Sequence, residues 1–330
     1  MTLFDQLFHT YGMSLQPVTL YGRQWLTNGE QIFYLKPQSA FYHPDIKELH
    51  AYSSQLIYLG DRQTAGIVPT QKGDYVSKID QQHYVLLALP AIERPERPDG
   101  ISLALFHNRG RSILNQMPSS YYLFHGWRDF WSKRVDDLSI HWNEIEQKRE
   151  RSEYDEVFLR VFPYFVGRAE NAIQYLTDLI MDEPVPEQPV ICHHRFNEFS
   201  WGSETLFAKT PDQWVIDHPS RDLTEWIRFA VYNNQRPVSE VYDFIDDYQG
   251  KNELSTGGLG LVFARLLFPI VFIENGEAVF DGAADTEMAL HRLNRLLERV
   301  DEEERLLASF GKRYIKSLPR VDWLAHKLKS

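Results

Sequence analysis

The chain has 330 residues, a length that suggests about two domains or one domain with two lobes. Its 43% of hydrophobic residues excludes a mostly disordered protein, and its single cysteine, Cys192, excludes an intrachain disulfide and a cysteine-rich zinc site. The formal net charge of −11 disfavours a protein that binds nucleic acid mainly through the phosphate backbone, although a local basic patch is compatible with it.

Residues 1–89 favour a small antiparallel sheet that contains one helix. Asn28-Gly29 stands between two β-rich runs and is typical of a tight hairpin whose two central residues take positive φ. Apolar residues spaced three or four apart predict a helix over 44–59, with Asp45 in its first turn. Strands are predicted at 18–22, 24–27, 31–36, 67–69 and 83–89.

The segment 90–98 combines three prolines with several charged residues, which is typical of a hinge or linker. Beyond it the pattern is mainly helical, and Pro163 is expected to kink one long helix. The most apolar run, 259–273, is shorter than the roughly 20 residues that cross a membrane, so it predicts a buried core helix. Helices are predicted at 101–113, 126–150, 153–181, 222–233, 238–248, 259–268 and 285–310.

A short β-like island interrupts these helices, with strands predicted at 190–192, 205–208 and 214–217. A small sheet with one helix, a hinge, and a larger helical part with a β island is the layout of a protein-kinase-like phosphotransferase. The predicted fold class is therefore α+β, with a two-lobe protein-kinase-like fold. Its expected divisions are an N-lobe at 1–89, a hinge at 90–98 and a helical C-lobe at 99–330, and a layout alone does not give function.

Phosphoryl transfer needs a cation on the phosphates and carboxylates that hold magnesium. Lys36, at the end of a predicted strand, is the candidate cation, and Glu48 on the following helix is its candidate partner. Asp217, directly after a short apolar strand, is the candidate magnesium ligand. Each residue also has a plainer interpretation, because Lys36 suits the end of a hairpin strand and Asp217 suits the cap of a turn or helix.

The catalytic loop of such an enzyme is expected about 20 residues before the magnesium ligand. His193 follows an apolar strand there, as that loop requires. Arg195 stands where the loop needs a proton-accepting aspartate, and Ser200 stands where it needs an asparagine for magnesium. Arginine carries a permanent positive charge and cannot accept a proton, so the loop is degenerate.

The motifs along the chain resemble those of the aminoglycoside phosphotransferase and choline kinase superfamily. Within that superfamily the chain is most similar to the CotS-type spore coat group and its YutH-type endospore coat-associated proteins. The motifs that carry the resemblance, in the order of the family, are Phe33-Tyr-Leu-Lys36-Pro, Tyr84-Val-Leu-Leu, Leu103-Ala-Leu-Phe-His107, Phe162-Pro-Tyr-Phe165 with Ala169-Glu170, Val190-Ile-Cys-His193, and Trp214-Val-Ile-Asp217 with Arg221-Asp222-Leu. His194, Arg195 and Ser200 depart from the superfamily's H-G-D-x-x-x-x-N loop.

This resemblance implies a kinase-shaped structural or adaptor protein of the endospore coat, with little or no phosphotransferase activity. Its implied partners are other coat or coat-morphogenetic proteins, with no nucleic acid and no membrane span. Residues 1–12 lack the features of a secretory signal, so synthesis in the cytoplasm of the mother cell and deposition in the coat are expected.

Three alternatives stay open at this point. An active small-molecule kinase would use ATP and Mg²⁺ with Lys36 and Asp217, and would recruit a carboxylate such as Glu198 as its base. Alternatively, Arg195 could form an ion pair with Asp217 and occupy the magnesium site. A metal site at Cys192-His193-His194 is disfavoured, because no further ligand at suitable spacing completes a zinc set.

Overall fold

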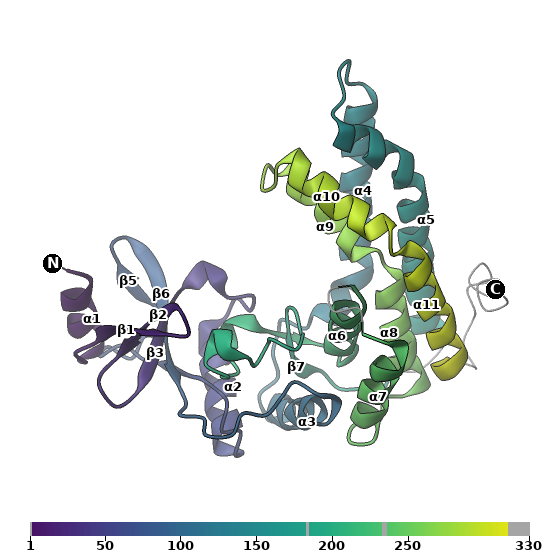
Figure 1. Cartoon of the computed structure of the whole chain (residues 1–330). Helices are drawn as coiled ribbons and strands as arrows, with labels where there is room; N and C mark the ends of the chain where they lie inside the picture. Colours follow the sequence, from purple (N-terminus) through teal and green to yellow (C-terminus); the bar gives the residue numbers. More distant parts are fainter. Residues whose placement is uncertain (1, 183–184, 233–235, 316–330) are drawn as a thin grey trace. The chain divides into compact units, whose positions relative to one another are not determined.

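The computed structural model describes residues 2–182, 185–232 and 236–315 (Figure 1). The chain divides into two compact units, and each unit is built from stretches that are far apart in the sequence. The first unit contains Met1–Leu123, Gln188–Trp226 and Tyr242–Glu253. The second contains Phe124–Glu187, Ile227–Val241 and Leu254–Ser330.

A six-stranded antiparallel sheet forms the N-terminal part of the first unit. The strands are β1 (Gln16–Leu20), β2 (Arg23–Thr27), β3 (Ile32–Pro37), β4 (Gly66–Val68), β5 (Ser77–Ile79) and β6 (Gln82–Leu89). Their order is β1-β2-β3-β6-β4, and β5 also pairs with β6. The long strand β6 is thus central, with β3 along one edge and the short strands β4 and β5 along the other.

The turns of this sheet differ in type from the sequence prediction. Asn28-Gly29 does lie between paired strands, but of these two residues only Gly29 has a positive φ. The side-chain oxygen of Asn28 accepts hydrogen bonds from the backbone N–H groups of Glu30 and Gln31, which makes a wider loop. Two-residue turns with positive φ at both positions are Tyr21-Gly22, with φ values of 49° and 73°, and Asp80-Gln81 between β5 and β6, with 44° and 66°. Such a turn fits the twist of paired strands, so Tyr21-Gly22 makes a tight tip between β1 and β2.

Three helices accompany this sheet in the first unit: α1 (Leu3–Tyr11), α2 (Ile46–Tyr58) and α3 (Gly100–Gln116). Helix α2 starts at Asp45, whose carboxylate caps it. The sequence analysis did not predict α1 or β5. Helix α1 begins with a capping box between Thr2 and Asp5, and it buries Leu7 and Tyr11 in the core cluster of the sheet.

Helix α3 packs closely against a second, two-stranded sheet. Strands β7 (Val190–His193) and β8 (Trp214–Asp217) pair antiparallel, as expected from two of the three apolar runs. A Cβ atom at Gly110 of α3 would lie 2.9 Å from the backbone nitrogen of Ile191, so only glycine fits this contact. The predicted strand at 205–208 is wrong, because Leu206 and Phe207 have positive φ values that a strand excludes.

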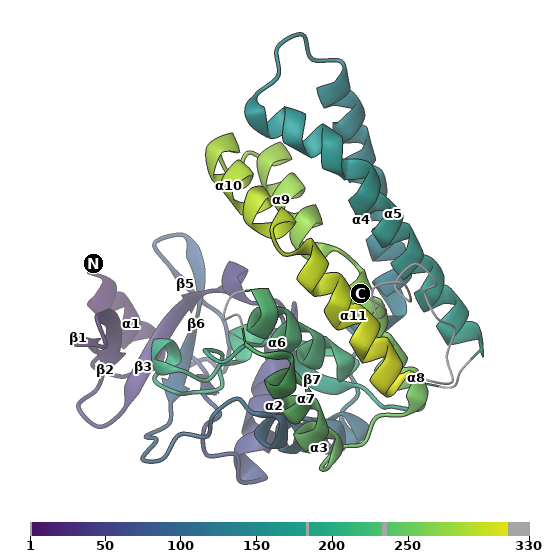
Figure 2. The same ribbon diagram turned by 45° about the vertical axis from the view of Figure 1, so that its right-hand side comes forward.

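The second unit is helical in its described residues. Helices α4 and α5 lie side by side in both views (Figures 1 and 2), and α8 packs between α5 and α11. The bounds are α4 (Trp127–Glu146), α5 (Glu153–Asp182), α8 (Thr256–Leu267), α9 (Ile270–Phe280), α10 (Thr286–Leu297) and α11 (Val300–Tyr314); α6 (Ser220–Tyr232) and α7 (Val238–Gln249) each contribute to both units.

Two long helical predictions are divided in the structure. The apolar run 259–273 forms α8 and α9, which separate at Pro269, and the run 285–310 breaks at Glu298-Arg299 into α10 and α11. Within the described ranges, no single helix meets the length and hydropathy of a membrane span; α8 and α9 meet them only jointly, with a 44° bend. The overall composition of the fold, an N-terminal antiparallel sheet followed mainly by helices, confirms the α+β prediction.

Candidate functional site

The side chain of Lys36 forms an ion pair with Asp212 in the first unit. Lys36 lies on β3, opposite Val85 of β6, and its Nζ contacts Asp212 Oδ2. Asp212 belongs to a short 3-10 turn, Pro211–Gln213, directly before β8. The pair therefore joins the N-terminal sheet to the turn that leads into the small sheet.

The carboxylate of Asp212 is fully buried and only half satisfied. Its Oδ2 also accepts the side-chain amide of Gln213 at 2.9 Å, while its Oδ1 has no hydrogen-bond partner. A buried carboxylate oxygen without a partner is costly, and a cation bound there would satisfy it. Asp212 is thus the acidic residue that faces Lys36. The sequence analysis missed it, because the turn that carries it has no strand before it.

Asp217, the predicted magnesium ligand, contacts residues of the turn into α6 in the structure. It ends β8, and its Oδ1 accepts the amide of His218 at 2.8 Å. Its Oδ2 lies 2.5 Å from Nε of Arg221 in the first turn of α6. The plainer interpretation, an aspartate that organises the turn into the following helix, describes these contacts.

Glu48, the predicted partner of Lys36, is also engaged elsewhere. Its Oε2 accepts hydrogen bonds from Ser119 at 2.7 Å and from Tyr52 at 3.1 Å, and lies 3.3 Å from Nε2 of His43. Burial lowers the pKa of His43, so this neutral imidazole contributes a polar contact rather than a full ion pair. Lys36 and Glu48 therefore do not act as a pair here, since each has other partners.

His193 holds the loop after β7 in place. Its backbone N–H donates to Asp222 Oδ1 at 2.8 Å, and its Nδ1 lies 2.8 Å from Asp222 Oδ2. Its Nε2 accepts the indole N–H of Trp201 at 3.1 Å. Both ring nitrogens of His193 are thus engaged, one by the carboxylate and one by the indole N–H, which leaves neither for a metal ion.

Asp222 also contacts a second histidine, His107 of α3. His107 Nε2 lies 3.1 Å from Asp222 Oδ2, and His107 Nδ1 lies 2.8 Å from the hydroxyl of Tyr248, which also accepts from Asn252. Burial alone would raise the pKa of Asp222, but His193 and His107 lower it to about 2, so the carboxylate stays ionised. The buried carboxylate of Asp222 is thus stabilised by contacts with both histidines.

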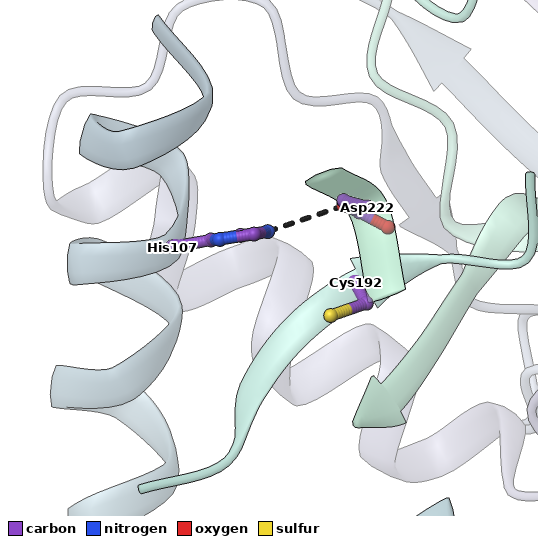
Figure 3. A group of neighbouring side chains, drawn as sticks. All are labelled: His107, Cys192 and Asp222. Carbon is purple, nitrogen blue, oxygen red and sulfur yellow. Dashed lines mark hydrogen bonds and ion pairs between the residues drawn. The ribbon is translucent and has the colours of Figure 1, made fainter. Parts of the chain in front are cut away.

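His107, Cys192 and Asp222 form the group in Figure 3, with ligand atoms within 4.8 Å of one another. Both nitrogens of His107 are already used, one by Asp222 and one by Tyr248. The thiol of Cys192 donates to the carbonyl of His218 at 3.5 Å. We therefore interpret this group as a buried hydrogen-bond cluster that supports the loop, not as a metal site.

Arg195 is the residue that the sequence motifs predict at the place of the proton acceptor of a kinase loop. Its guanidinium forms an ion pair with Glu225 of α6 at 3.0 Å, and Glu225 is buried. In the structure Arg195 pairs with Glu225 and Asp217 binds Arg221, while the predicted pair between Arg195 and Asp217 stays a prediction. Ser200 closes the same loop, since its hydroxyl accepts from the amide of Asn197 and donates to the carbonyl of Arg195.

Comparison of the sequence with known proteins identifies its family. Residues 4–310 match the family described as "Spore coat putative kinase YutH". The endospore coat-associated protein YutH of Bacillus subtilis is 28% identical over 326 residues, which are 95% of this chain and 96% of that protein.

Solved structures of small-molecule kinases share the fold. An aminoglycoside phosphotransferase from Alicyclobacillus acidocaldarius superposes with a TM-score of 0.68 at 14% identity, over 92% of this chain and 94% of that one. A spectinomycin phosphotransferase gives a TM-score of 0.58 at 15% identity, over 94% and 97%. At these identities the likeness shows the kinase-like fold, and it confirms the fold that the sequence analysis predicted.

Proposed function

Because the chain belongs to the YutH family of kinase-like spore coat proteins, we propose that it is a structural or adaptor component of the endospore coat that transfers no phosphoryl group. It is made in the cytoplasm of the mother cell and then deposited in the coat. Its partners are other coat or coat-morphogenetic proteins. The support for this location is the family itself and the coat association that the name of the Bacillus subtilis relative states.

The observation that carries the absence of catalysis is the ion pair between Arg195 and Glu225. A guanidinium cannot accept the proton of an attacking hydroxyl, and general-base catalysis contributes about 10²–10⁴-fold to the rate. The pair also engages the buried carboxylate of Glu225 on α6. The scaffold is retained in this chain, while the group that takes the proton is absent from its place in the loop.

Lys36 and Asp212 retain the parts of a nucleotide site. Lys36 is the residue that would contact the phosphates of ATP, and the unpartnered Oδ1 of Asp212 fits a magnesium ligand. When bound, Mg²⁺ supplies positive charge against the transferring phosphoryl group. This pair favours a second candidate function, an ATP- and Mg²⁺-dependent kinase for a small-molecule hydroxyl. Glu198, half-buried on the loop of Arg195, would then serve as the base.

Phosphoryl transfer from ATP to a panel of small alcohols, at saturating Mg-ATP, tests the proposal. The native chain is expected to give no transfer above background. The variant R195D/E225Q restores a carboxylate at the loop without placing two carboxylates against each other, and it is expected to raise transfer by about 10²–10⁴-fold. The matched control is R195K/E225Q, which keeps the positive charge and is expected to stay at the native level. Robust transfer by the native chain would contradict the proposal and support the second candidate.

A further inference from the structure

The segment that follows the degenerate loop is held in a strained conformation. After the 3-10 turn Ser203–Thr205, Leu206 and Phe207 both take positive φ, at 51° and 63°. Residues with side chains avoid this region, and each such residue costs on the order of 1 kcal/mol or more. Two in succession require contacts that compensate them.

One set of contacts ties Phe207 to the predicted hinge. The side-chain amide of Gln63 donates to the carbonyl of Phe207 at 2.8 Å, and its oxygen accepts the backbone N–H of Glu96 at 2.8 Å. Gln63 is buried, and its own carbonyl accepts the amide of Lys209 at 2.7 Å. One side chain therefore connects the hinge segment to the strained turn, and it uses a hinge N–H that would otherwise be free for a ligand.

Buried charges fix the end of the same segment. The Nζ of Lys209 is fully buried, binds Asp61 at 2.8 Å and Glu96 at 3.1 Å, and lies 4.4 Å from the ring centre of Trp201. Arg109 of α3 binds the same oxygen of Asp61 at 3.2 Å. Since a buried charge without its partner is strongly unfavourable, these pairs hold the segment against the hinge.

The other end of the segment reaches the tip between β1 and β2. The ring of Phe207 meets the ring of Tyr21 edge to face, with centroids 6.3 Å apart. Arg23 of β2 forms an ion pair with Glu204 at 3.1 Å. Phe207 therefore lies between the β1–β2 tip on one side and Gln63 with its hinge contact on the other.

In protein kinases the loop between the first two strands covers the phosphates of ATP, and the cation on the third strand binds them. On that pattern the nucleotide site of this scaffold is expected beside the β1–β2 tip and Lys36. We propose that residues 203–207 fill that site as a built-in plug, with the ring of Phe207 in the place of a nucleotide. This inference rests on the kinase-like site assigned above and adds that the native chain binds Mg-ATP poorly.

Binding of a fluorescent ATP analogue with Mg²⁺, measured by anisotropy, tests the plug. In Phe207→Gly the ring is removed and the positive φ becomes free of strain, so the fold is expected to persist. The variant is expected to bind at least about tenfold more tightly than the native chain, a change of about 1.4 kcal/mol. E204A/F207A removes the ion pair and the ring together, and it is expected to shift affinity in the same direction. Phe199→Ala, an exposed phenylalanine on the preceding turn, is the control and is expected to leave affinity unchanged.

Each outcome decides the inference separately from the proposed function. Equal affinity of the native chain and both variants, whether high or undetectable, would refute the plug. Tight binding by the native chain without phosphoryl transfer would refute the plug and leave the proposed function standing. Transfer by the native chain would refute the proposed function, while a gain of binding in Phe207→Gly would still support the plug.

Discussion

Asp222 is a fully buried carboxylate that stays ionised because donors surround it. It accepts the backbone N–H of His193, and both His193 and His107 contact its Oδ2. Hydrogen bonds to a charged group stabilise the fold more than bonds between neutral groups. If the carboxylate of Asp222 were lost, its buried donors would be left without an acceptor. This residue holds the loop after β7 against α3 and α6.

Asp222→Asn is therefore expected to destabilise the protein by about 2–4 kcal/mol. The amide keeps the volume, but it cannot accept from three donors and brings its own N–H groups toward them. Urea denaturation, followed by circular dichroism, measures the free energy of unfolding. Asp243→Asn, at an exposed position on α7, is the matched control and should change it by less than about 0.5 kcal/mol. A cost at Asp222 as small as that of the control would show that the cluster adds no stability.

The same cluster predicts a loss of stability in acid. The pKa of Asp222 is about 2 in the folded chain against 3.8 without the fold, so its stabilisation is complete above about pH 4 and disappears as the pH falls toward 2. Burial also lowers the pKa of His107 from 6.5, so the unfolded chain takes up a proton there that the folded chain refuses. The free energy of unfolding therefore falls as the pH drops below about 6.5, because protonation of His107 favours the unfolded chain.

Urea midpoints measured from pH 7 down to pH 3 are expected to fall throughout. In Asp222→Asn the fall below pH 4 should be smaller, since the titrating carboxyl is gone, while the fall that His107 causes should remain. Identical pH profiles of the native chain and the variant would contradict the assignment of the acid effect to Asp222.

At the scale of elements, the contact of α3 with β7 depends on one glycine. Gly110 lets the helix approach the backbone of Ile191, where a Cβ atom would meet the nitrogen at 2.9 Å and the side chain at 3.2 Å. Because β7 leads directly into His193, this contact also sets where the degenerate loop begins. Packed backbones cannot move apart locally without a cost to their neighbours.

Gly110→Ala is expected to cost about 1–3 kcal/mol of unfolding free energy, as overpacking of a close contact does. Gly167→Ala in α5 is a matched control, because a Cβ there meets nothing within 4 Å and alanine favours a helix. That control is expected to stabilise the protein by up to about 1 kcal/mol. Thermal melting of the two variants checks the signs, and a stabilising effect of Gly110→Ala would contradict the close packing.

Sequence patterns predicted the elements well where burial is periodic. The helices α2, α3 and α5 and the strands β3 and β6 follow the predicted ranges closely, because a long amphipathic or apolar pattern allows one interpretation. Helix α1 and strand β5 are short, and their apolar residues become informative only when packed in the cluster of Leu7, Ile79 and Leu86. The run at 205–208 looked β-rich, but tertiary contacts of Phe207 override its local preference.

At the scale of the whole molecule, neither compact unit is a continuous stretch of sequence. The first joins the N-terminal sheet to α3, β7, β8 and parts of α6 and α7, so its core is assembled from three separate segments. The division into an N-lobe at 1–89, a hinge at 90–98 and a C-lobe at 99–330 stays a prediction. Family membership agrees with a fold that spans the chain, since the match covers residues 4–310.

The sequence alone determined the fold class and the family, and it predicts the loss of the proton acceptor, because periodicity, ordered motifs and the identity of Arg195 are all properties of the chain itself. The tertiary structure decided the partners. Lys36 binds Asp212 rather than Glu48, Arg195 binds Glu225, and the ring of Phe207 packs against that of Tyr21 in the β1–β2 turn. These pairs join residues more than 25 positions apart, and no local pattern specifies which of several carboxylates a charged side chain meets once the chain is packed.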